Sequence, residues 1–145
     1  MRTKVIPLDK ITTRDKQSKK SNGYIVSLWK DWETILPKQP HQVYLNVCEP
    51  GQVKGPHLHK QRWQQYACLF GQGRIVVKYG KGDYEEIDID AAAAPVVVII
   101  PAGTASAIQA TGKKDFVLLN MPHPAWHPDN QDDHPVEFDD YVWRR

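Results

Sequence analysis

Two histidines separated by a single residue, His57 and His59, are the residues of this chain whose types and spacing best suit chemistry. An imidazole ring changes charge near neutral pH, so it can take up and return a proton, and it is a common metal ligand. Side chains alternate between the two faces of a strand, so on a strand both rings lie on one face. Imidazoles inside a protein are costly unless they are hydrogen-bonded or used. The spacing therefore predicts a site for proton transfer or for a ligand.

The residues around this pair resemble the first sequence motif of the cupin superfamily. The pattern starts at Gly51, reaches the histidine pair after five residues, and continues with Gln64 and Gly71. Residues 101–106 resemble the second cupin motif, Pro-x-Gly-x-x-His, with a serine at its last position. The resemblance spans roughly residues 23–121. It implies an all-β fold, the jelly-roll barrel that is also called a double-stranded β-helix.

The rest of the sequence supplies the strands that such a barrel needs. Short apolar segments rich in Val, Ile and Tyr recur, each bounded by Gly, Pro or Asn, which is typical of strands joined by tight turns. We predict strands at residues 23–28, 42–48, 65–70, 74–79, 84–89, 96–100, 105–109 and 116–121.

The segments outside these strands carry weaker signals. Residues 29–36 could form a short amphipathic turn or helix, and residues 1–21 are basic and polar, so we expect them to be loose. Residues 122–145 are rich in Pro, Asp, His and Trp without a period, which favours an extended cap over the barrel. We therefore expect one cupin domain over residues 1–145, with its barrel at about 23–121.

The composition indicates an ordinary folded protein. Of the 145 residues 41% are hydrophobic and 25% charged, with a formal net charge of +2, a balance that argues against disorder. No basic stripe alternates with aromatic residues, so we expect no nucleic-acid partner. The longest apolar run, residues 91–101, is too short to cross a bilayer, and residues 1–4 hold no signal-peptide core. We expect no membrane partner and a cytoplasmic location. Cys48 and Cys68 do not make a disulfide framework.

The ligand positions of the motif argue against a metal. Metal-binding cupins typically use three histidines and one glutamate, whereas the matching positions here hold His57, His59, Gln64 and Ser106. Glutamine and serine offer neither an anion nor an imidazole to a transition metal. We expect no metal and no cofactor. A histidine from the tail could complete a site with the pair, which keeps a metal-dependent cupin oxygenase as an alternative; the candidates are His123, His127 and His134.

Within the cupins, the chain resembles enzymes that act on nucleotide-linked 4-keto sugars. Residues 54–57, Lys-Gly-Pro-His, resemble the Arg-Gly-x-His motif of the dTDP-4-dehydrorhamnose 3,5-epimerase group. Residues 57–60, His-Leu-His-Lys, resemble the dTDP-sugar 3,4-ketoisomerases. The resemblance implies an isomerase for a nucleotide-linked 4-keto-6-deoxy sugar, in surface polysaccharide or deoxysugar biosynthesis. Ser106 and Tyr66 stand where the epimerases carry a histidine and a lysine, so a non-catalytic sugar-binding cupin is a further alternative.

The chemistry assigns roles to these residues. Removing a proton next to a ketone needs a base with a pKa near neutrality and a donor for the developing enolate oxygen. The resemblance nominates His57 as the base, with His59 beside it and Tyr66 or Tyr44 as the acid. Asp132 or Asp133 are candidates for the carboxylate that orients the base. The predicted substrate-binding residues, which supply cations for a diphosphate, an aromatic ring for a base and polar contacts, are Lys54, Lys60, Arg62, Trp63, Gln64 and Ser106.

We also expect a homodimer. Cupins commonly pair by exchanging strands, and Trp29, Trp32 and the first strand of the barrel are candidates for the contact. This expectation rests on analogy with the family.

Overall fold

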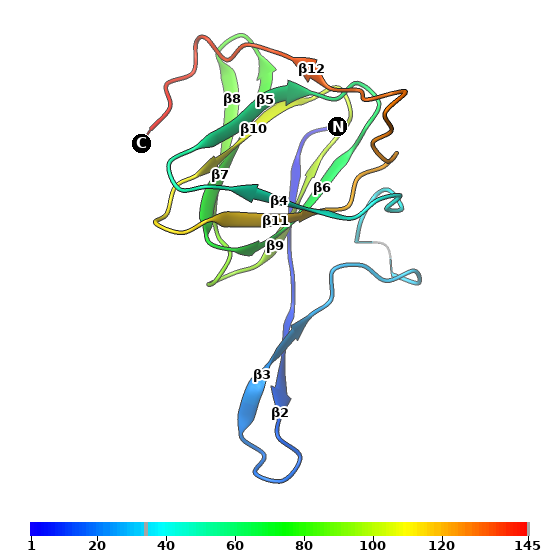
Figure 1. The fold of residues 1–145 in the computed structure, drawn as a ribbon, viewed down its shortest axis with the longest axis vertical. Coiled ribbons are helices and arrows are strands. Elements are labelled where there is room, and N and C mark those ends of the chain that lie inside the picture. The colour runs from blue at the N-terminus through cyan, green and yellow to red at the C-terminus, as the bar shows by residue number, and fades with distance from the viewer. Residues whose placement is uncertain (34, 145) are drawn as a thin grey trace.

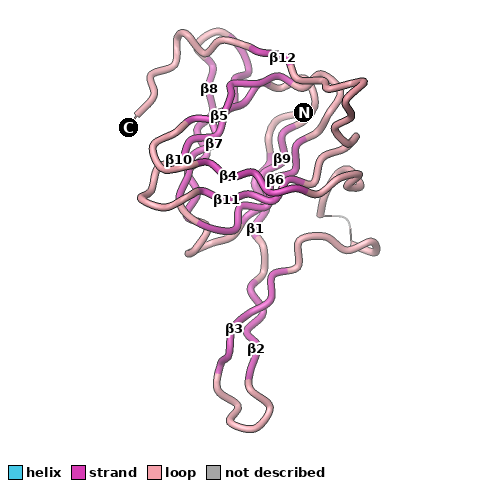
Figure 2. Tube along the Cα trace, in the orientation of Figure 1, coloured by secondary structure: helices cyan, strands magenta, loops and turns pink. Residues whose placement is uncertain are grey.

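The structure, a computed structural model, describes residues 1–33 and 35–144. These residues form strands and no helix (Figure 2). The strands are β1 (Lys4–Pro7), β2 (Lys10–Arg14), β3 (Ser21–Val26), β4 (Tyr44–Cys48), β5 (Val53–Leu58), β6 (Gln64–Phe70), β7 (Gln72–Gly80), β8 (Asp83–Asp90), β9 (Val96–Ile100), β10 (Ala105–Ala110), β11 (Phe116–Asn120) and β12 (His134–Pro135). The described residues thus include no helix long and apolar enough to cross a membrane.

Two five-stranded sheets face each other and form the barrel (Figure 1). The first has the order β1-β9-β6-β11-β4, and the second has the order β12-β5-β10-β7-β8. From β4 to β11 the chain crosses repeatedly between the sheets, and only β7 and β8 are successive neighbours in one sheet. This connectivity is the double Greek key of a jelly roll. The all-β jelly-roll fold predicted from the sequence is confirmed, and so are the strands predicted between residues 42 and 121. β5 was not among the predicted ranges, and the strand expected at residues 23–28 of the barrel is β3, which pairs with β2 in a separate sheet.

The core lies between the two sheets and follows from the alternation of side chains along each strand. Ile75 and Val77 of β7 meet Phe116 and Leu118 of β11 in one buried cluster. All four side chains are fully buried. A Cβ atom at Gly73 would lie 2.0 Å from the ring of Phe116, so a glycine is required where β7 passes this ring.

Each sheet is also covered on its outer face. On the first sheet, Val97 and Ile99 pack with Leu8 and Leu36 in a second buried cluster. On the second sheet, Phe138 of the C-terminal tail packs in a third cluster that is continued by other aromatic residues of the tail and of β8. The barrel is therefore a sandwich whose outer faces are covered by the chain's own terminal segments.

The expectation that residues 1–21 are loose was wrong. β1 pairs with β9 at the edge of the first sheet, and β2 pairs with β3 in a separate two-stranded arm. The arm projects from the barrel, with residues 15–20 at its tip (Figure 1). Residues 29–36 contain no helix among their described members; an isolated bridge joins Lys30 and Glu33, and Thr34 lies outside the described residues.

Candidate active site

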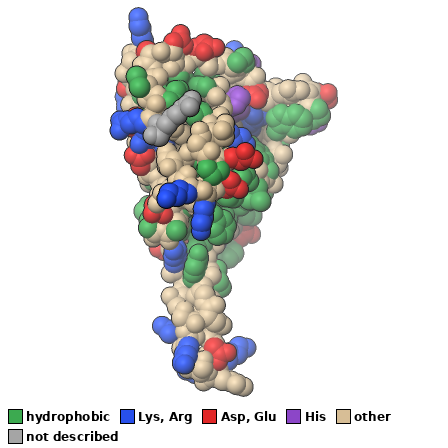
Figure 3. Space-filling view, turned by 60° about the vertical axis from the view of Figure 1, so that its left-hand side comes forward, with side chains coloured by type: hydrophobic (Ala, Val, Ile, Leu, Met, Phe, Trp, Pro, Cys, Tyr) green, Lys and Arg blue, Asp and Glu red, His purple; other side chains and the backbone are tan. Residues whose placement is uncertain are grey.

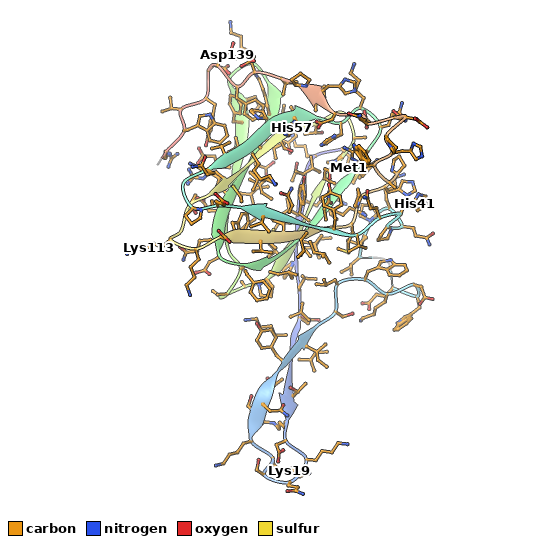
Figure 4. All side chains as sticks on the ribbon, viewed as in Figure 1. Met1, Lys19, His41, His57, Lys113 and Asp139 are labelled. Carbon is orange, nitrogen blue, oxygen red and sulfur yellow. The ribbon has the colours of Figure 1, made fainter. Side chains whose placement is uncertain are left out.

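Both imidazoles line a small cavity between the two sheets, on the side of the barrel away from the arm (Figure 4). The cavity has a volume of about 70 Å³, room for roughly two water molecules. Its walls come from four strands and from the segment that follows β5: Asn46, Lys54, His57, His59, Tyr66, Ser106, Ala107 and Ile108. The cavity therefore holds one small reacting group and not a whole sugar nucleotide.

His57 forms a pair with a carboxylate from the tail. In the sheet it lies opposite Ser106 of β10 on one side and Pro135 of β12 on the other. Its Nδ1 atom is 3.0 Å from Oδ1 of Asp133, and both side chains are about half exposed. A Cβ at Gly55 would come within 3.1 Å of the His57 ring, and Gly55 has a φ of 94°, so both its space and its backbone favour glycine. The paired carboxylate can orient the ring and stabilise its protonated form.

His59 lies deeper and is held differently. Its ring centre is 6.3 Å from that of His57, and the two planes are inclined by 26°. Its Nδ1 atom is 2.7 Å from the carbonyl oxygen of Asp132 and 2.9 Å from a terminal nitrogen of Arg62. Burial lowers the pKa of His59, the positive charge of Arg62 lowers it further, and the contact with Asp132 only partly opposes this. His59 is therefore a neutral imidazole near pH 7.

Asp132 organises the segment that follows β5. Its carboxylate accepts backbone N–H groups from Lys60, Gln61 and Arg62 at 2.9, 2.9 and 2.8 Å. The side chain is only 6% exposed. Burial favours the neutral acid, but these N–H groups and His134 outweigh burial and lower the pKa of Asp132. The backbone at Asp132 is in the left-handed region, with a φ of 47°, a conformation that Asp tolerates better than most residues.

The wall from the first sheet carries a hydrogen-bonded chain of polar side chains. Oδ1 of Asn120 accepts the backbone N–H of Gln65, which fixes the orientation of its amide. The Nδ2 group then donates to the hydroxyl oxygen of Tyr44 at 2.7 Å and to Oε1 of Gln64. Tyr66 lies beside them, and burial raises the pKa of its phenol, so the phenol is protonated near neutral pH.

The structure brings together most of the predicted site residues, but not all. Lys54 lines the cavity and donates to Oδ1 of Asn46 and to the Val47 carbonyl. Lys60 is exposed and does not line the cavity. Trp63 packs in the apolar cluster outside the first sheet, with Lys38 Nζ 5.2 Å from its ring centre. Its predicted role as a platform for a nucleotide base has no support in this placement.

Arg62 is also placed differently from the expectation. Its side chain belongs to the buried residues, at 4% exposure, and one terminal nitrogen donates to the carbonyl of Gln131 at 2.9 Å. A phosphate outside the barrel cannot reach it. Sequence reasoning missed Asn46 and Asn120, although each is a polar residue at an inward position of an otherwise apolar strand, which is the signal that could have found them.

The donor set does not fit a metal ion. In residues 1–33 and 35–144, no group of three or more His, Cys, Asp or Glu side chains is placed to hold one. The tail histidines are engaged elsewhere: His123 with the Gln39 carbonyl, His127 with Asp129 and His134 with Asp132. No step of the chemistry below is assigned to a metal.

Comparison with protein families gives one match. The model of the polysaccharide biosynthesis C-terminal domain matches residues 30–134, well over half of the chain. No curated protein matches the chain.

Solved structures give further matches. The capsular polysaccharide assembling protein CapF from Staphylococcus aureus is 25% identical with a TM-score of 0.62, covering 68% of this chain and 27% of its own. The chain thus spans about a quarter of CapF. A dTDP sugar isomerase from Desulfovibrio desulfuricans G20 has a TM-score of 0.78 at 15% identity, covering 94% of this chain and 85% of its own. ChmJ, a 3'-monoepimerase from Streptomyces bikiniensis solved with dTDP-quinovose, has a TM-score of 0.72 at 17% identity, covering 94% and 70%. These likenesses show a cupin fold.

Proposed function

This chain belongs to the family of the polysaccharide biosynthesis C-terminal domain, and we propose that it is a carbohydrate isomerase. Its substrate would be a nucleotide-linked 4-keto-6-deoxy sugar, and its reaction would move a proton on a carbon next to the ketone. The observation that carries the proposal is the contact between His57 and Asp133 at the mouth of a cavity that also holds a neutral His59 and a protonated Tyr66.

In the proposed mechanism His57 is the base. The ring nitrogen that does not face Asp133 takes the proton from the carbon next to the ketone, and the electron pair of the broken C–H bond moves into the carbonyl to form an enolate. The Asp133 carboxylate stabilises the resulting imidazolium. Returning a proton to the opposite face of that carbon gives an epimer. A ketoisomer forms if the former carbonyl oxygen is protonated, the hydroxyl group of the deprotonated carbon loses its proton to become the new ketone, and the former carbonyl carbon receives a proton. Tyr66, a protonated phenol that lines the same cavity, is the proposed acid.

The size of the cavity limits how the substrate is held. About 70 Å³ accepts the ketone edge of the sugar, so the ring and the nucleotide must lie at the open mouth. Lys54 and Lys60 are the exposed cations nearest the histidine pair in sequence, and they are the proposed partners of the diphosphate. Their ammonium groups bind phosphate as point charges, without the two-pronged geometry of an arginine.

Solvent exchange tests this function directly. A 4-keto-6-deoxy sugar linked to dTDP is incubated with the protein in D₂O, and deuterium entering next to the ketone is followed by NMR. We expect exchange with the wild-type protein and none with His57→Ala, which should still bind the nucleotide sugar in calorimetry. Asp133→Asn should slow exchange by roughly 100-fold, the lower end of the usual range for acid–base catalysis. His127→Ala, which alters an exposed ring outside the cavity, is the matched control.

Each outcome distinguishes the alternatives. Exchange that persists in His57→Ala would show that another group is the base. Binding of the nucleotide sugar without any exchange in the wild-type protein would identify a non-catalytic sugar-binding cupin. Exchange that is lost to chelators and restored by a transition metal would identify a metal-dependent enzyme, contrary to the donor set described above.

A further inference from the structure

One nitrogen of His59 has two hydrogen-bond partners that it cannot satisfy together. The Asp132 carbonyl oxygen, 2.7 Å from Nδ1, can only accept a proton, whereas the Arg62 guanidinium, 2.9 Å from the same atom, can only donate one. A protonated Nδ1 suits Asp132 and repels Arg62; an unprotonated Nδ1 suits Arg62. The position of the proton on this ring is therefore decided by which contact is worth more.

Both partners are held in place, so neither contact can be relieved by a large movement. Asp132 is fixed by the three backbone N–H groups that its carboxylate accepts from residues 60–62. Arg62 is fixed by its own backbone N–H to Asp132 and by its side-chain contact with the carbonyl of Gln131.

Losing the hydrogen bond to His59 costs more free energy at the buried Arg62 guanidinium than at the Asp132 carbonyl. Arg62 is 4% exposed, and its Nε atom already has no hydrogen-bond partner among the residues that the structure describes. If His59 did not accept its N–H, a second donor of a buried cation would be unpaired, which is more costly than leaving a neutral carbonyl oxygen unpaired. A hydrogen bond from a charged donor is also about twice as strong as a neutral one. The contact with Arg62 therefore determines which nitrogen of His59 carries the proton.

We propose that Arg62 is a positioning residue that holds His59 in the neutral tautomer with its proton on Nε2. Nδ1 is unprotonated and accepts from Arg62, and the other nitrogen, which has no hydrogen-bond partner within residues 1–33 and 35–144, carries an N–H for the cavity. His59 is then a hydrogen-bond donor and cannot be a second base. The ring stays singly protonated because burial and the charge of Arg62 both disfavour the imidazolium.

This tautomer gives the two histidines different tasks. Resting on the function proposed above, His57 with Asp133 removes the proton, while the Nε2–H of His59 stabilises the oxygen on which negative charge develops. A neutral imidazole can serve as such a donor without giving up its proton completely. The tautomer itself does not depend on the reaction, so it can be measured without any substrate.

Nitrogen-15 NMR of the ligand-free protein, labelled at histidine, tests the proposal. Long-range proton–nitrogen correlations at pH 7.5 show which nitrogen of each ring is protonated. We expect His59 with a protonated Nε2 and an unprotonated Nδ1. A spectrum with the proton on Nδ1, or on both nitrogens, would overturn the proposal, and the wild-type protein alone is sufficient for this result.

Two variants then test the role of Arg62. Arg62→Met keeps an unbranched apolar stem but removes the donor, and we expect the proton to move to Nδ1, where the Asp132 carbonyl accepts it. Arg62→Lys restores a charged donor and should restore the Nε2–H form. Arg144→Met, which changes a mostly exposed arginine of the tail, should leave the His59 signals unchanged. An unchanged tautomer in Arg62→Met would assign its control to another group.

The outcome is separable from that of the exchange experiment. If no nucleotide sugar exchanges deuterium but His59 carries its proton on Nε2, the proposed reaction is wrong and the role of Arg62 stands. If exchange occurs and the proton is on Nδ1, the reaction stands and His59 is not the oxyanion donor.

Discussion

At the scale of single residues, the carboxylate of Asp132 shows how the tail supports the site. The carboxylate accepts three consecutive backbone N–H groups, and the side chain is almost fully buried. The backbone carbonyl oxygen of the same residue contacts His59. Asp132 thus holds the segment after β5 in place and also positions the His59 ring in the cavity. This is a positioning role, distinct from that of the neighbouring Asp133, which contacts His57.

We expect Asp132→Asn to lower the free energy of unfolding at pH 7 by about 1–3 kcal/mol, because an uncharged amide offers these N–H groups one acceptor oxygen in place of two. The pKa of Asp132 is lower in the folded chain than its ordinary value of 3.8, so its contribution is complete above that pH. The contribution is lost as the pH falls through the lowered pKa. Denaturant unfolding of both proteins from pH 7 to pH 2 should show the gap closing only below about 4.

A gap of the same size at every pH would mean that the ionised carboxylate is not what Asp132 contributes. Asp129→Asn is the matched control, since the side chain of Asp129 is 91% exposed and should matter little at any pH.

The residues of the site were predictable as types but not as partners. The spacing of the histidine pair was enough to place both rings at one cavity. The need for a carboxylate that orients the base nominated two adjacent aspartates, but only the fold shows that each contacts a different histidine. The burial of Arg62 was not predictable, because it depends on a tail segment about 70 residues away that covers it. Sequence spacing carries no information about such long-range cover.

At the scale of elements, β7 passes so close to the ring of Phe116 that position 73 has no room for a side chain. Gly73→Ala would place a Cβ 2.0 Å from the fully buried ring of Phe116. We expect a loss of about 1–3 kcal/mol in the free energy of unfolding, since a packed core cannot move aside without strain. Gly80→Ala, at the far end of the same strand, meets no atom within 4 Å and should change stability by less than about 0.5 kcal/mol. Equal effects of the two substitutions would contradict this account.

The arm formed by β2 and β3 was predicted only in part: a strand was expected at residues 23–28, but as part of the barrel, and β2 was not expected. β2 is short and largely exposed, and no apolar period marks it, because it does not face the barrel core. The pairing of β1 with β9 joins segments about 90 residues apart and likewise leaves no local signal. The barrel strands were predictable because each buries at least one face, and buried positions carry apolar residues at strand spacing or in a continuous run.

The arm also bears on the expected homodimer. Ile11 and Ile25 face each other across its two strands, and both are more than half exposed. A two-stranded hairpin is marginal by itself in water. The outer side of β4, at the edge of the first sheet, exposes Leu45 and Val47. Figure 3 shows apolar side chains gathered where the arm meets the barrel and charged ones at its tip. We propose that the arm of one copy packs on a second copy of this chain.

Ile25→Lys should then convert a dimer into a monomer, because it places a charge beside Ile11 on the face of the arm that exposes both isoleucines. Light scattering after size exclusion measures the mass directly. Lys19→Gln, at the tip of the arm, should leave the dimer intact. A wild-type protein that is a monomer at all concentrations would rule out the packing of the arm on a second copy.

At the scale of the whole molecule, the C-terminal tail couples the outer surface of the second sheet to the cavity. Beyond β12 it packs Phe138 against Val76 and Ala107, and Phe138 stacks on Trp143 at 6.4 Å. The same segment delivers Asp133 to His57. Because β12 has only two residues, its position depends on the aromatic packing that follows it.

Phe138→Ala should therefore affect both stability and catalysis. We expect a loss of about 3 kcal/mol in the free energy of unfolding, as for other buried phenylalanines. We also expect slower deuterium exchange into the sugar, although residue 138 does not touch the cavity. Val142→Ala is the control, since Val142 is 82% exposed. Normal exchange in a destabilised Phe138→Ala would show that the tail holds the barrel without positioning Asp133.

The order of the chain around the cavity has a consequence for how the protein is made. His57, Tyr66 and Ser106 leave the ribosome before Asp132 and Asp133, whose backbone carbonyl and carboxylate contact His59 and His57, respectively. The two imidazoles therefore gain their orienting partners only after every strand from β4 to β11 has been made.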